Sequence, residues 1–109
     1  MKLSGNIVIP QGKLLQYLLL PREENDKSRF LTSAGYSLVT WSRLNQDLRQ
    51  LILNHEVSEV EDSPYGQKYT VRGSMRGPNG QALHVMTIWI KLEGREEMRF
   101  VTLFPDKGR

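Results

Sequence analysis

The chain has 109 residues and a net charge of +3, and 39% of its residues are hydrophobic and 25% charged. These values are typical of one globular domain with its own core. Its longest apolar run, residues 14–20, is interrupted by Gln16 and ends at Pro21, well short of the roughly 20 residues that span a bilayer. We therefore expect no membrane association, and a cytoplasmic location. The absence of cysteine excludes a disulfide framework, a thiolate metal site and a cysteine nucleophile.

The charge is distributed unevenly along the chain. Residues 1–62 contain seven Lys/Arg and eight Asp/Glu, whereas residues 63–109 contain eight and four. The second half is therefore basic, which suits a partner that carries phosphate groups. The alternative is that these charges solvate exposed strands and loops.

The first half is predicted to be mainly helical. Residues 6–9 form an extended segment before Pro10, and a helix over residues 11–20 follows from the stripe of Leu14, Leu15, Leu18 and Leu19. A second, short helix is expected over residues 27–34, with Asp26 as its N-cap and Gly35 at its end. Residues 22–26 read as a charged loop.

The third helix is predicted to begin near residue 37 or 40 and to end near His55. Apolar residues recur there at helical spacings of three, four, three and one: Trp41, Leu44, Leu48, Leu51 and Ile52. This is the clearest helical pattern in the chain.

The second half has the alternation and turns of a sheet. Strands are expected over residues 56–62, 68–75, 82–92 and 99–104, followed by a frayed tail at 106–109. The Asn79–Gly80 pair favours a hairpin between the second and third of these strands, because both residues accept positive φ. The predicted fold class is α+β: two to three N-terminal helices pack on one face of a C-terminal antiparallel sheet of about four strands. Residues 1–109 form a single domain, with a helical half at 1–56 and a sheet at 57–105.

Side chains alternate between the two faces of a strand, which allows the faces to be predicted. Over residues 82–92 we assign His84, Met86, Ile88 and Ile90 to the helix-covered face, because most of them are apolar. Six residues then share the open face: Lys68, Thr70, Arg72, Thr87, Trp89 and Lys91. Such a face can hold a phosphate with its cations and stack a base on the indole. The alternative is that Trp89 packs beneath a loop or a partner.

The sequence lacks the motifs of several kinds of binding and catalytic site. The chain has no glycine-rich phosphate loop and no metal-ligand spacing, so neither a cofactor nor a metal is predicted. His55 lies at a helix end, where a cation complements the dipole, and His84 shares a strand face with Met86, so both read as structural. The acidic residues cluster in loops and turns, which argues against a glycosidase or a metal-dependent hydrolase.

The chain resembles a small, uncharacterised bacterial domain family. The resemblance covers nearly the whole chain and lies in these segments: Lys27-Ser28-Arg29-Phe30, Gly35-Tyr36, Trp41, Leu44, Tyr65-Gly66, Lys68-Tyr69, Gly77-Pro78-Asn79-Gly80, Thr87-Ile88-Trp89 and Val101-Thr102-Leu103-Phe104-Pro105. No activity follows from this family.

The order of elements is also similar to that of the barnase–EndoU–colicin-D–RelE group of metal-independent ribonucleases, many of which are toxins. The resemblance implies RNA cleavage on the open sheet face. By this resemblance Lys27 corresponds to the group's helical lysine or histidine, Thr87 and Trp89 to a hydroxyl–x–tryptophan pair, and Thr102 to a hydroxyl on the closing strand. The chain departs from the most active members in having no histidine beside Lys27.

Two functions remain open from the sequence. The first is a ribonuclease-like toxin domain in which Lys27, Thr87 and Thr102 are catalytic. The residues expected to bind its RNA are Arg29, Lys68, Arg72, Trp89 and Lys91. The second is a non-catalytic interaction module, such as an antitoxin, immunity or adaptor protein, which uses the same face on a protein partner.

Overall fold

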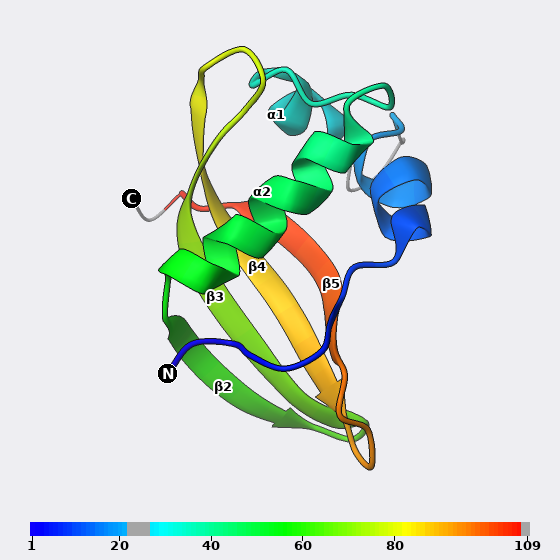
Figure 1. Cartoon of the computed structure of the whole chain (residues 1–109), viewed down its shortest axis with the longest axis vertical. Coiled ribbons are helices and arrows are strands. Elements are labelled where there is room, and N and C mark those ends of the chain that lie inside the picture. Colours follow the sequence, from blue (N-terminus) through cyan, green and yellow to red (C-terminus); the bar gives the residue numbers. More distant parts are fainter. Residues whose placement is uncertain (22–26, 108–109) are drawn as a thin grey trace.

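Figure 1 shows the computed structural model of the chain, which describes residues 1–21 and 27–107. Its elements are β1 (Ile7–Val8), the π-helix η1 (Lys13–Leu18), α1 (Ser28–Thr32), α2 (Trp41–Asn54), β2 (Val57–Ser63), β3 (Gly66–Arg76), β4 (Ala82–Leu92) and β5 (Met98–Pro105). The predicted loop at 22–26, with the predicted N-cap Asp26, lies outside the described residues, as does the end of the predicted tail at 108–109.

The strands form one five-stranded sheet in the order β1-β5-β4-β3-β2. β2 to β5 are antiparallel neighbours, whereas β1 runs parallel to β5 through the pairs Ile7↔Met98 and Val8↔Arg99. The predicted α+β class is confirmed, but the sheet is mixed and has five strands rather than four. The additional strand comes from the segment that we predicted only as extended. A two-residue strand carries no periodic signal, and its pairing with β5 is set by tertiary structure.

The first helix differs from the prediction in type. Over Lys13–Leu18 the backbone forms a π-helix, and the Leu19 N–H donates to the Leu14 carbonyl at 3.0 Å, a bond between residues five apart. Leu14 and Leu18 are buried as the leucine stripe predicted. π-Helical turns are rare and are frequent at functional sites.

The short helix α1 ends where a glycine was expected. Gly35 has φ +94°, and the Tyr36 N–H donates to the Leu31 carbonyl at 3.2 Å, which closes the helix end. The hairpin between β3 and β4 docks here, because the Asn79 N–H donates to the Ala34 carbonyl at 3.1 Å.

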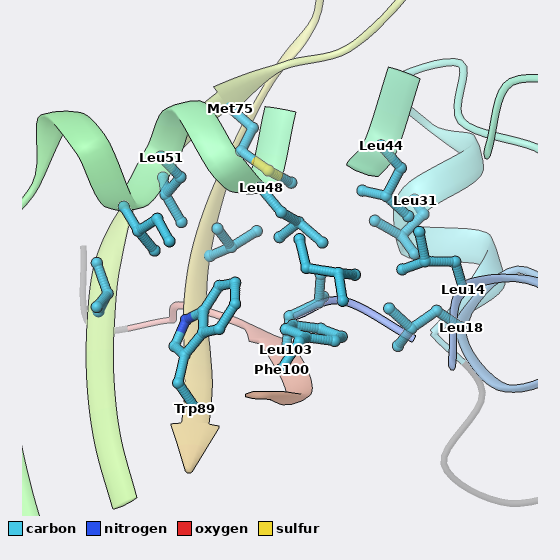
Figure 2. Close-up of a cluster of buried hydrophobic side chains, with 14 of the residues drawn as sticks. Leu14, Leu18, Leu31, Leu44, Leu48, Leu51, Met75, Trp89, Phe100 and Leu103 are labelled. Atoms are coloured by element: carbon cyan, nitrogen blue, oxygen red, sulfur yellow. The ribbon is translucent and has the colours of Figure 1, made fainter. Parts of the chain in front are cut away.

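The long helix α2 crosses one face of the sheet (Figure 1). Its buried residues are Leu44, Leu48, Leu51 and Ile52, which belong to the stripe that predicted it. They pack with Trp89, Phe100 and Leu103 of the sheet into the main hydrophobic core (Figure 2). At the helix end the ring of His55 lies over β3, where a Cβ on Gly73 would come within 2.8 Å of it. This glycine lets the helix end close to the sheet.

We predict that Gly77→Ala destabilises the fold. A Cβ at residue 77 would lie 2.1 Å from the Ala34 carbonyl oxygen, a contact that only movement of the backbone can relieve. We expect a loss of about 1–3 kcal/mol in the free energy of unfolding, measured by urea denaturation. Gly12→Ala is the matched control, because its Cβ would meet only the Gln16 side chain at 3.8 Å. Equal stability of the Gly77→Ala variant and the wild type would contradict this contact.

A second prediction concerns Tyr36, whose buried hydroxyl donates to Asp47 Oδ2 at 2.5 Å. Burial first, and then the hydrogen bond and the charge of Asp47, raise the pKa of Tyr36 well above its ordinary value of 10.0. Above that pH the unfolded chain releases this proton while the native protein keeps it. The free energy of unfolding should therefore fall as the pH rises above 10.0.

The comparison of two variants isolates this effect. Tyr36→Phe should reduce the alkaline loss of stability, measured by urea denaturation at a series of pH values. Tyr65→Phe should leave it unchanged, since Tyr65 is 73% exposed. An unaltered alkaline slope in the Tyr36→Phe variant would rule out this residue as the cause.

Candidate functional site

The structure reverses our assignment of the two faces of β4. The pairs Lys68↔Ile90, Thr70↔Ile88 and Arg72↔Met86 place those β4 residues on the open face. The pairs Tyr69↔Trp89 and Val71↔Thr87 lie on the helix-covered face, and Trp89 and Thr87 are both 0% exposed. The prediction that Thr87 and Trp89 line the open face is therefore wrong. His84, which we placed in the core, is exposed on that open face.

The reason lies in the packing of Trp89. Its Nε1 donates to Thr87 Oγ1 at 2.8 Å, and the Thr87 hydroxyl donates to the Val71 carbonyl at 2.9 Å. The indole also makes an edge-on contact with Phe100, with 5.2 Å between ring centroids. Figure 2 shows the ring directed into the cluster of leucines beneath α2. Both faces of β4 are rich in apolar residues, so the sequence of this strand could not decide between them.

This chain of hydrogen bonds gives a prediction for Thr87. Thr87→Val keeps the shape of the side chain but leaves the Trp89 N–H without its acceptor inside the core. We expect a loss of about 1–3 kcal/mol in stability, measured by chemical denaturation. Thr70→Val on the open face is the control and should change stability little. Equal effects of the two substitutions would contradict the assigned faces.

The remaining predicted binding residues do not form one basic surface. Lys91 pairs with Gln67 and lies on the opposite face from Lys68. On the open face Arg72 is bound to Glu59 at 3.3 Å and to Asp106 at 3.4 Å, and Lys68 pairs with Glu61 in the sheet register. The open face is therefore mixed in charge, not basic as predicted. Arg29 is exposed on α1.

The structure does bring together two of the three predicted catalytic residues. Lys27 and Thr102 are 75 residues apart in sequence, and Lys27 Nζ donates to Thr102 Oγ1 at 3.0 Å. The same ammonium donates to the Tyr17 hydroxyl at 3.1 Å and lies 4.4 Å from the centroid of the Phe104 ring. We call Tyr17, Lys27, Thr102 and Phe104 the Lys27 cluster. Thr87 lies in the core and takes no part in it.

Three elements position this cluster. Lys27 is the residue immediately before α1, Thr102 and Phe104 belong to β5, and Tyr17 comes from η1. Tyr17 was not predicted from the sequence as part of the site. The leucine stripe marked that helix as a packing element, and its π-helical geometry, which sets the direction of Tyr17, is not readable from the sequence.

Lys27 is a buried cation, only 7% exposed. Within residues 1–21 and 27–107 no carboxylate forms an ion pair with it; its partners there are two hydroxyls and two aromatic rings. Burying a charge is costly unless it is paired. An ammonium group has three N–H donors, and two are used by Tyr17 and Thr102. No other described residue accepts a hydrogen bond from this ammonium, so its third donor can bind an anion that reaches the cluster.

A hollow of about 270 Å³ lies against this cluster on the open face. Its lining residues are Glu59, Glu61, Lys68, Thr70, Ile88, Val101, Thr102 and Phe104. It thus shares Thr102 and Phe104 with the Lys27 cluster, and combines an aromatic wall, two hydroxyls, a lysine and two carboxylates.

Two other features are absent from the part of the chain that the structure describes. No three of the His, Asp and Glu side chains in this part are grouped so that they could hold a metal ion. No helix in it is long and apolar enough to cross a membrane.

The fold and the site define a small α+β protein with helices on one face of a mixed sheet and a buried-lysine cluster at the β5 side. The family model described as "Domain of unknown function (DUF6883)" matches residues 2–107, and the chain belongs to that family. No curated protein matches the chain.

A solved structure shares the fold. Its description is "Contact-dependent growth inhibition toxin - immunity protein complex from Klebsiella pneumoniae 342". The match has a TM-score of 0.67 and 15% identity, and it covers 91% of this chain and 99% of that chain. The similarity at this identity concerns the fold.

Proposed function

We propose that this chain is a toxin-type domain that cleaves RNA without a metal, at the Lys27 cluster. The observation that carries the proposal is the buried Lys27 ammonium, which contacts Thr102 and has no carboxylate partner among the described residues. The similarity in fold to a chain of a toxin–immunity complex supports the same class. A phosphate is the ligand whose charge and oxygen acceptors complement this group.

The hollow beside the cluster supplies groups for the reaction. In the proposed step the 2′-oxygen of a ribose bonds to the adjacent phosphorus, and its proton passes to the carboxylate of Glu61, which lines the hollow. The bond from phosphorus to the 5′-oxygen breaks, and the leaving oxygen takes a proton from Lys27. The products are a 2′,3′-cyclic phosphate and a 5′-hydroxyl.

The other groups have binding roles in this proposal. The Thr102 hydroxyl donates to a phosphate oxygen, and the positive charge of Lys27 stabilises the negative charge that accumulates on these oxygens in the transition state. The base of the substrate stacks on Phe104, which is 38% exposed at the edge of the hollow. Glu59 is bound to Arg72, so Glu61 is the carboxylate that we assign as the base.

Lys27→Met tests the proposal directly. Methionine fills a similar volume without the charge, so the variant should fold as stably as the wild type or more stably. It should lose about 10²-fold or more in RNA cleavage, because a general acid contributes that much. The measurement is the cleavage of total tRNA and mRNA in the presence of EDTA, together with thermal unfolding of each protein. Thr102→Val should lower cleavage in the same way.

The matched control is Lys2→Met, which removes an exposed lysine outside the cluster. It should retain wild-type cleavage. Wild-type protein that leaves both RNA pools intact would overturn the enzymatic proposal.

One observation favours a second, non-catalytic function. The open face combines charges of both signs with the half-buried side chains of Met86, Ile88 and Ile90, a mixture common at protein interfaces. A module that binds a protein through this face would leave RNA intact. Such a partner would be expected to co-purify from the native cell, and its binding would depend on those three residues.

A further inference from the structure

A second lysine lies at the same aromatic ring as Lys27. Lys13 Nζ is 5.5 Å from the centroid of the Tyr17 ring, and Lys27 Nζ is 5.0 Å from it. Lys13 is half-buried at the start of η1. Among the described residues neither ammonium forms an ion pair with a carboxylate. Two cations are therefore gathered at one phenol ring, and no carboxylate of residues 1–21 and 27–107 is paired with either of them.

Such an arrangement of two like charges is electrostatically unfavourable. The two ammonium groups repel each other, and the electron-rich face of one ring attracts both but carries no net charge. An anion bound beside the ring would relieve the repulsion. A polyanion with charges at regular intervals would relieve it at both lysines.

We propose that Lys13 binds the phosphate next to the one that is cleaved. This inference rests on the proposed function, in which Lys27 holds the reacting phosphate. It narrows the substrate class to RNA with at least two consecutive phosphates, since a dinucleoside monophosphate would leave Lys13 unused. Tyr17 then has a positioning role: its ring lies by both cations, and its hydroxyl accepts from Lys27.

The local backbone supports this assignment. Lys13 and Tyr17 are four residues apart in η1, so they lie on neighbouring turns of the same side of the helix. The segment is a π-helix, a geometry that is frequent at functional sites. The leucines Leu14 and Leu18 of the same segment bury the adjacent side in the core. The leucines thus anchor the helix in the core, and the side next to them presents Lys13 and Tyr17.

The test measures binding rather than cleavage, so that it does not depend on catalysis. The ligands are 2′-deoxy dinucleotides, which cannot react, either unphosphorylated or carrying a phosphate at the 5′ or the 3′ end. Calorimetry should show that wild-type protein binds one of the phosphorylated forms about tenfold more tightly than the unphosphorylated one. The ligand that binds more tightly, with its phosphate at the 5′ or the 3′ end, shows in which direction the strand is bound.

Three variants test whether Lys13 causes the preference for the phosphorylated ligand. Lys13→Met should bind all three ligands alike, at the wild-type affinity for the unphosphorylated one, whereas Lys13→Arg should restore the preference because it restores the charge. Lys27→Met should weaken binding of every ligand. For a longer oligonucleotide, Lys13→Met should also reduce the slope of log affinity against log salt by about 1. Lys2→Met, with an exposed lysine elsewhere, should match the wild type throughout.

Two results would overturn the inference: no preference for a second phosphate in the wild type, or a preference that survives in Lys13→Met. Failure of the proposed function looks different, because RNA would stay uncut while the phosphate preference and its dependence on Lys13 remained. Thermal unfolding of each variant shows that the changes in affinity arise in folded protein.

Discussion

The burial of Trp89 is the interaction on which the rest of the structure depends. Its indole fills the space between the sheet and α2, and its N–H is satisfied by Thr87, whose hydroxyl is in turn bound to β3. Because side chains alternate along a strand, this one placement decides the faces of all of β4 and, through the register, of β3. It directs Met86, Ile88 and Ile90 outward.

The candidate site is a consequence of the same arrangement. With the helices on the Trp89 face, α1 and η1 lie at the β5 side of the sheet and bring Lys27 and Tyr17 to Thr102 (Figure 1). The cluster sits beside the open face rather than at its centre. The proposed chemistry therefore depends on a buried lysine and its neighbours, and does not require the broad basic surface that the charge distribution suggested.

The agreement between sequence and structure varies with the range of the interactions. The buried stripe of α2, the glycine at the end of α1 and the Asn-Gly hairpin were predicted correctly, because each depends on nearby residues. β1 was missed as a strand, since only its pairing with β5 defines it. The faces of β4 were assigned wrongly because the assignment counted aliphatic residues on each face. It did not weigh Trp89, the largest side chain of the strand, whose burial removes the most apolar surface from water.

The sequence by itself determined the α+β class, the order of the elements from η1 to β5 and two members of the cluster, Lys27 and Thr102. Local periodicity, turn chemistry and a family resemblance were sufficient for these. The tertiary structure decided which face of the sheet the helices cover, that Tyr17 joins Lys27 and Thr102 with Lys13 beside its ring, and that Arg72 on the open face meets Glu59 and Asp106. These depend on contacts between residues far apart in the chain, where packing volume and charge pairing act only after the fold has formed.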